Sequence, residues 1–212
     1  MIHYHGTPLT PREMLLRMAG KHFCVSFADP RDAEVCLDIG QSVMWDNGAF
    51  TAFTQGKTFD INAFYEWVEP RLGHPHWAVI PDEIGGDEAQ NRAKLATWPF
   101  PKELGAPVWH LHMHTDYLLY LCDNYPKVCF GSSGEYWKIG TIKWEQRIDE
   151  AFNATCHGFT CFEVLPRPAS GGLSLRLIAS TWHAITKTLR LTQRRWRVGL
   201  MACSVPCIGI QT

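Results

Sequence analysis

The strongest constraint on the fold is an alternation of short apolar runs with amphipathic segments through the first 154 residues. Strands are expected over residues 22–27, 42–45, 77–80, 108–111 and 128–130. Helices are expected over residues 10–20, 29–40, 60–69, 87–97, 115–124 and 141–153. Helix starts carry Asp, Thr or Pro, as at Asp60, and two helices end at Gly20 and Gly40. Strands that alternate with helices in this way predict parallel βα units.

The predicted architecture is α/β, a TIM-type (β/α) barrel with five to six βα units in residues 1–154. The loops are short, and no GxGxxG motif follows the first expected strand, which counts against a dinucleotide-binding sheet. In such barrels the functional residues lie at the C-terminal ends of the strands. Polar or small residues occupy all of those ends here, namely Asp29, Asp46, Asp82, residues 110–114 and residues 131–133.

Composition is typical of a globular chain, with 46% hydrophobic and 19% charged residues. No apolar stretch reaches the ~18 residues of a membrane span, and the N-terminal segment lacks a signal-peptide pattern. The eight cysteines are scattered, which predicts reduced thiols and a cytoplasmic protein. Cys203 and Cys207 have no matching second pair, so no zinc is expected.

Two aspartates are the leading candidates for chemistry. Asp46 ends an apolar strand, where it serves either as general base or nucleophile with a raised pKa, or as a cap of the next turn. Gly48 would let a flat ligand lie against the backbone, between Asn47 and Phe50. Asp82 either caps the helix downstream or accepts two N–H bonds from the amidine edge of a guanine-type base.

Two further segments carry residues suited to ligand binding. The loop Gly131, Ser132, Ser133, Gly134 and Glu135 either presents backbone groups to a ligand or is a plain turn. The segment 110–114 places three imidazoles, His110, His112 and His114, on one face of an extended chain. Substrate contact or strand-end packing is the favoured interpretation. A metal-dependent barrel hydrolase that uses His110 and His112 is the alternative.

Taken in chain order, these motifs resemble the tRNA-guanine transglycosylases, barrel enzymes that exchange a guanine for a 7-deazaguanine. DNGAF resembles their DSGGF loop, IPDEIGG their base-reading aspartate segment, and GSSGE their glycine-rich loop. Over residues 3–154 the chain is most similar to the DpdA-type paralogs of phages and bacteria, which insert 7-deazaguanines into DNA. The structural zinc site of the tRNA enzymes has no counterpart here.

The resemblance implies a glycosyltransferase that exchanges bases on nucleic acid, with DNA favoured over tRNA, through a covalent glycosyl intermediate on a carboxylate. Asp46 would be the general acid/base and Asp82 the base recogniser. The other expected base contacts are Asn47, Gly48, Phe50 and residues 131–135. Asp29, His110 and His112 are expected to contact the substrate. A modified purine is the expected small partner, without cofactor, metal or membrane, and further DNA-modification proteins are expected as macromolecular partners.

Residues 155–212 break this pattern. They hold seven basic residues and one acid, Glu163, for a net charge of +6, whereas residues 1–154 carry 13 basic and 20 acidic residues, a net charge of −7. Back-translated into another frame, residues 157–169 and 173–187 can encode peptides that resemble what the family carries next. The tail is therefore interpreted as out-of-frame translation after about Cys156. The attacking carboxylate would then be missing, and the chain as written is expected to be inactive. A non-catalytic remnant or binding module is the remaining alternative.

Overall fold

The computed structural model describes residues 2–155, 162–165 and 174–177, and it has an α/β fold. The strands are β1 (Ile2–Gly6), β2 (His22–Ser26), β3 (Ser42–Asp46), β4 (Trp77–Val79), β5 (Gly105–Ala106), β6 (Val108–His110), β7 (Val128–Gly131), β8 (Phe162–Leu165) and β9 (Ser174–Leu177). The α-helices are α1 (Glu13–Leu16), α2 (Ala33–Ile39), α3 (Ala49–Thr54), α4 (Ile61–Val68), α5 (Glu88–Leu95), α6 (Thr115–Asn124) and α7 (Ile142–Thr155).

Strands β1 to β5 form a parallel sheet in which the spatial order follows the chain order. This confirms the predicted parallel βα units. One residue, Pro107, separates β5 from β6, and β6 pairs in parallel with β7. Strand β8 pairs in parallel with β7, while β9 pairs antiparallel with β1. Most of the tail interpreted as out of frame, residues 156–161, 166–173 and 178–212, lies outside the described residues.

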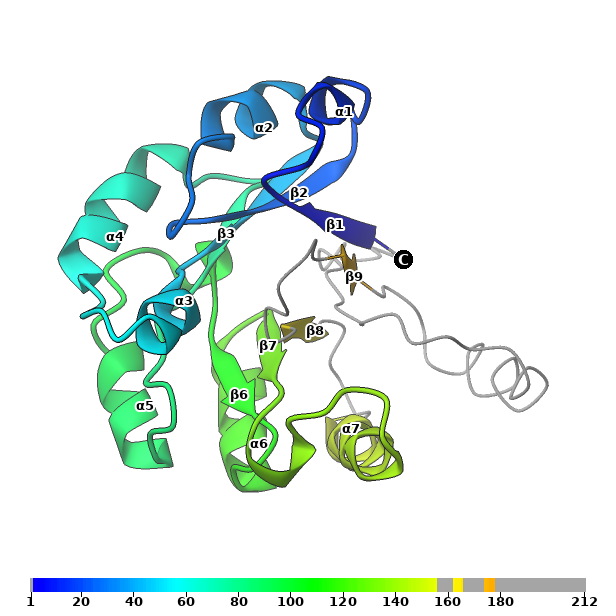
Figure 1. Ribbon diagram of the computed structural model, residues 1–212. Coiled ribbons are helices and arrows are strands. Elements are labelled where there is room, and N and C mark those ends of the chain that lie inside the picture. The colour runs from blue at the N-terminus through cyan, green and yellow to red at the C-terminus, as the bar shows by residue number, and fades with distance from the viewer. Residues whose placement is uncertain (1, 156–161, 166–173, 178–212) are drawn as a thin grey trace, which may run out of the picture.

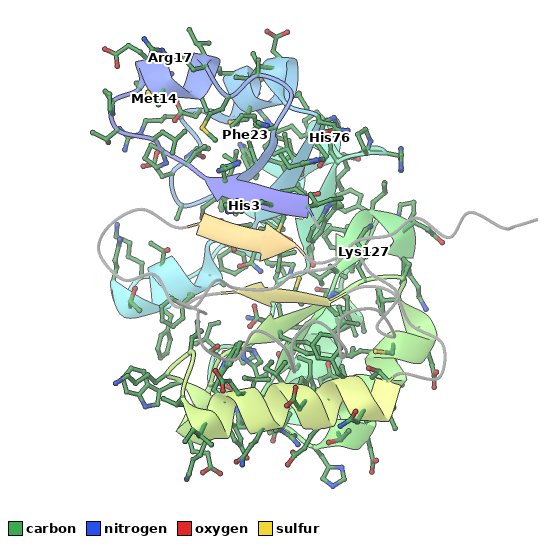
Figure 2. The ribbon with its side chains drawn as sticks, turned by 90° about the vertical axis from the view of Figure 1, so that its right-hand side faces the viewer. His3, Met14, Arg17, Phe23, His76 and Lys127 are labelled. Carbon is green, nitrogen blue, oxygen red and sulfur yellow. The ribbon has the colours of Figure 1, made fainter. Side chains whose placement is uncertain are left out.

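The helices cover one side of the strands. In Figure 1, α1, α2, α4, α5, α6 and α7 lie around the outside of the strands. Side chains alternate along each strand, so Val43 and Trp45 of β3 pack with α1, α2 and α4, and Met44 points to the opposite face. Figure 2 shows Phe23 of β2 beneath α1 and α2, and Met14 and Arg17 on the outward side of α1.

The opposite face of the strands has a different core, built without helices. Its buried members come from the strands themselves and are Tyr4, Met44, Trp77, Val79, Ala106, Val108 and Cys129. A separate cluster joins α5, α6 and α7 to the outer face of β6 and β7, with Trp109 and Phe130 at its centre. The strands are therefore packed on both faces, but by helices on only one.

Local signals located most helices. The helix predicted over residues 115–124 matches α6, and Asp60 caps α4 by accepting hydrogen bonds from Asn62 and Ala63. The predicted start at Thr10 was wrong, since α1 begins at Glu13 after Arg12, which makes no side-chain capping bond. Strand β1 and helix α3 were not predicted, because both are short and neither has a start signal of its own.

Four cysteines fall in the described part of the chain, and all four are free thiols. Burial raises the pKa of Cys36 and of Cys122 to about 12, so both stay protonated at neutral pH and are poor nucleophiles. None of the helices in the described segments combines the length and apolarity that a bilayer crossing requires.

Candidate functional site

The predicted site residues gather at the C-terminal ends of parallel strands. Ser26 ends β2 and Asp46 ends β3, and the register pairs these two residues. Asp82 follows β4, while His110 and Gly131 end β6 and β7 and are also a register pair. Because parallel strands end at the same edge of a sheet, residues up to 105 positions apart in the sequence lie at one end of the fold.

Asp46 is a buried carboxyl group at this end, with a raised pKa. Its Oδ2 accepts a hydrogen bond from the Gly48 backbone N–H at 3.2 Å. Burial is the largest influence on the Asp46 pKa and raises it; the negative charge of Asp82 raises it further. Hydrogen bonds from Ser26 and Gly48 oppose the shift, and the net pKa is above the ordinary aspartate value. A carboxyl group with a raised pKa is suited to general acid/base chemistry near neutral pH.

Asp82 forms a buried pair with His110. The side chains are 8% and 10% exposed, and His110 Nε2 lies 2.7 Å from Asp82 Oδ2. A carboxylate oxygen accepts and a ring N–H donates, so the contact assigns Nε2 as the donor to Oδ2. No hydrogen bond to the other oxygen, Oδ1, is present within the described residues, so Oδ1 is the oxygen left to bind a ligand donor.

Asn47 and Gly48 have structural partners in addition to their predicted ligand roles. The buried Asn47 amide donates to the Ile80 carbonyl at 3.3 Å and accepts from the Ala49 N–H at 2.8 Å, which ties the end of β3 to the end of β4. Gly48 has a φ of +73°, and a Cβ there would lie 2.8 Å from the backbone nitrogen of Ala28. The space above Gly48 is thus occupied by the loop after β2.

The glycine-rich loop is held from two sides. Ser132 Oγ accepts a hydrogen bond from Trp144 Nε1 of α7 at 3.0 Å. Ser133 Oγ lies 2.7 Å from His112 Nδ1, and Gly134, at a φ of +55°, leaves room for the His112 side chain. Glu135 forms an exposed ion pair with Lys143 at 2.7 Å, which lowers the Glu135 pKa. The loop is fixed by its own side chains, and it begins at Gly131, the register partner of His110.

The three imidazoles of residues 110–114 do not converge. His110 contacts Asp82, whereas His112 contacts Ser133, and burial followed by the charge of His110 lowers the His112 pKa. His114 caps α6 by accepting from the Asp116 N–H. Within the described ranges, no group of three or more His, Cys, Asp or Glu is arranged to hold a metal ion. The geometry of the described residues therefore gives the hydrolase alternative no metal centre around His110 and His112.

Two predicted contacts lie at the margin of this end. Asp29 pairs with Arg31, whose guanidinium Nε donates at 2.8 Å, and this hydrogen bond lowers the Asp29 pKa. Phe50 lies in the first turn of α3 and is half-buried. Neither residue is tied to Asp82 or His110 by a described hydrogen bond.

Arg147 was not singled out by the sequence, although it fixes the histidine segment. From α7 it donates to the carbonyls of Leu111 and Met113 at 2.9 and 2.7 Å, and its guanidinium lies 4.9 Å from the Trp109 ring centroid. Its side chain is 13% exposed. A lone arginine in an amphipathic helix is expected to face solvent, so the sequence does not predict that it binds the backbone of the histidine segment.

Replacing Arg147 with alanine is expected to lower the free energy of unfolding by about 2–3 kcal/mol, since two buried carbonyls lose a charged donor. Arg31→Ala is the matched control, because the Arg31–Asp29 pair is exposed and such pairs contribute little to stability. Urea denaturation of both variants measures the difference. Equal midpoints for the two variants would show that Arg147 does not hold the segment.

Comparisons of the chain with protein-family models, with curated proteins and with solved structures found no match. A functional conclusion therefore has two supports: the chemistry of the residues assembled at the strand ends and the motif resemblance in the sequence. Asp46 and Asp82, the two residues that the resemblance names, lie at the C-terminal ends of the neighbouring strands β3 and β4.

Proposed function

We propose that the chain carries the base-binding part of a transglycosylase that exchanges guanine for a 7-deazaguanine in nucleic acid, with DNA favoured and tRNA as the alternative polymer. One observation carries the proposal: Asp46 ends β3 and Asp82 follows the neighbouring parallel strand β4, so both carboxyl groups lie at the same end of the sheet. Asp46 can transfer a proton to the base that is released. Asp82, held by a histidine, can accept N–H bonds from the guanine-type base that binds.

The fold proposed for this activity is a TIM-type barrel. Strands in chain order require every crossover to run in the same sense, and right-handed crossovers then leave all helices on one face of the sheet. The opposite face is packed by strand residues alone, as in the interior of a barrel. Strands β8 and β9 belong to the tail interpreted as out of frame, and β9 runs antiparallel to β1, so the proposed barrel rests on β1 to β7.

In the proposed reaction a carboxylate attacks C1′ of the nucleoside, and the bond between C1′ and the guanine nitrogen breaks. Asp46 gives its proton to the departing base, and takes a proton from the incoming 7-deazaguanine when that base displaces the carboxylate from C1′. We expect the attacking carboxylate in the segment that the out-of-frame tail replaces. The 212-residue chain would then bind a base without exchanging it.

Separate measurements of base binding and of base exchange test the two parts of this proposal, the base-binding site and the missing nucleophile. Purified chain should bind 7-deazaguanine in calorimetry but incorporate no labelled 7-deazaguanine into single-stranded DNA or tRNA. A chain with the reading frame restored after about Cys156 should incorporate the label. Incorporation by the chain as written would contradict the missing nucleophile, and resequencing codons 153–158 tests the frame directly.

Asp82→Asn is expected to weaken 7-deazaguanine binding about 10- to 100-fold, because a charged acceptor is replaced by a neutral amide. Asp29→Asn is the control, since Asp29 pairs with Arg31 at the margin of the site. Calorimetric dissociation constants for the two variants provide the measurement. An unchanged constant for Asp82→Asn would remove Asp82 from base recognition.

A further inference from the structure

A contact between three strand ends bears on how Asp82 is held. Asp82 follows β4, His110 ends β6 and Gly131 ends β7. The His110 ring touches both of the others: Nε2 lies 2.7 Å from Asp82 Oδ2, and Nδ1 would lie 2.7 Å from a Cβ placed on Gly131. Gly131 has no unusual backbone angle, so the need for glycine at this position is steric.

Backbone hydrogen bonds hold the strand end that carries the His110 ring. The His110 backbone carbonyl accepts from the Met113 N–H at 2.8 Å, and Leu111 donates to the Gly131 carbonyl at 2.9 Å. A side chain on Gly131 would also lie 3.1 Å from Val108 Cγ1, so the added group could not move away from the ring without meeting Val108. Glycine at position 131 therefore leaves the imidazole the place from which it reaches Asp82.

We infer that His110 is a positioning residue that fixes the Asp82 carboxylate, that Gly131 makes this possible, and that the pair sets the preference for a base with an exocyclic amine. This inference rests on the proposed function. With Nε2 donating to Oδ2, rotation of the carboxylate is stopped and Oδ1 points in one direction. A ligand with two adjacent N–H donors can then bond to Oδ1 and to the remaining lone pair of Oδ2, whereas a ligand with one donor leaves one of these acceptors unpaired.

The probes are 7-deazaguanine and 7-deazahypoxanthine, which differ only in the exocyclic amine. The 212-residue chain is expected to bind 7-deazaguanine about 10- to 100-fold more tightly, as expected for one hydrogen bond to a charged group. His110→Ala should reduce that ratio to about threefold or less, mainly by weakening 7-deazaguanine binding. His110→Gln keeps an N–H donor in reach of Oδ2 and should retain most of the preference.

Gly131→Ala supplies a second, independent variant. It should abolish the preference as His110→Ala does, because the methyl group displaces the ring. In the His110→Ala background the same change should have no further effect, since the methyl group enters the vacated space. His114→Ala is the matched control from the same segment: that ring caps α6 by accepting from the Asp116 N–H, and the variant should keep the wild-type ratio.

An NMR measurement on the protein without ligand tests the contact between His110 and Asp82 directly. In nitrogen-15 NMR spectra the His110 Nε2–H proton should be protected by its carboxylate partner, and Gly131→Ala should remove that signal. An unchanged ratio and an unchanged signal in Gly131→Ala would overturn the inference. If the wild-type chain binds neither base, both the proposed function and the assignment of base preference are wrong. The NMR signal then tests only whether the contact among Asp82, His110 and Gly131 exists.

Discussion

Asp46→Asn is expected to abolish base exchange in the frame-restored chain and, at neutral pH, to stabilise the fold of the chain as written. Loss of a general acid/base typically slows a reaction about 10²- to 10⁴-fold. The stability change has the opposite sign because burial, and then the charge of Asp82, raise the Asp46 pKa. An asparagine avoids the cost of an ionised carboxylate there and can still accept the Gly48 N–H bond.

The dependence on pH follows from the direction of that shift. A carboxyl group with a raised pKa in the fold favours folding while it is protonated, below its unfolded-state pKa. That contribution is lost as the pH rises through the folded-state pKa. Asp46→Asn should therefore match the wild type in acid and exceed its melting temperature at higher pH. A constant difference across this range, or a more stable wild type at pH 7, would contradict the raised pKa.

Asp82→Asn offers a second check on the same interaction. Removing its negative charge should lower the Asp46 pKa, whereas Ser26→Ala should raise it, because the Ser26 hydroxyl stabilises the ionised form. Carbon-13 NMR titration of the Asp46 carboxyl group reads both directions on folded protein. Opposite responses from the two variants would identify the charge and the hydrogen bond as separate influences.

The sequence predicts those parts of the fold that depend on neighbouring residues. Asp60 and Asp87 cap helices because their side chains bond to backbone groups two or three positions away, and such pairs are visible in the sequence. The strand ends at Asp46 and Asp82 were predicted for the same reason, since each follows an apolar run. Strand β1 was not predicted because Ile2 and Tyr4 are its only large apolar residues, too few to define a period.

The contacts that define the site could not be predicted in this way. Asp82 and His110 are 28 positions apart, and their 2.7 Å contact depends on the register of strands that are not consecutive. Arg147 bonds to a carbonyl 36 positions away. Pattern analysis identifies which residues reach the strand ends, but the partner of each side chain is set by packing in three dimensions.

For Gly48 the sequence and the structure give different reasons why the residue is a glycine. The sequence explained this glycine by the close approach of a flat ligand. In the structure the same space holds the loop after β2, because a Cβ on Gly48 would lie 2.8 Å from the Ala28 nitrogen and 3.2 Å from Ser26 Oγ. The positive φ of +73° adds a second reason for glycine. These two causes can be separated by experiment.

Gly48→Ala is expected to lower the free energy of unfolding by about 2–4 kcal/mol, of which about 1–2 kcal/mol is left-handed strain and the rest is overlap with Ala28. Gly56→Ala is the matched control, because Gly56 has a φ of +65° but no atom within 4 Å of the position that an added methyl group would take. It should therefore show the strain alone, about 1–2 kcal/mol. Urea denaturation of both variants isolates the overlap as their difference.

The size of that difference decides what Gly48 does. A larger loss for Gly48→Ala means that the glycine exists to pack the loop after β2 against the Asp46 turn. The substitution should then also displace the Gly48 N–H from Asp46 Oδ2 and shift the Asp46 titration. Equal losses in the two variants would mean that Ala28 moves aside at little cost. The surface above Gly48 would then be open to a ligand, as the sequence alone suggested.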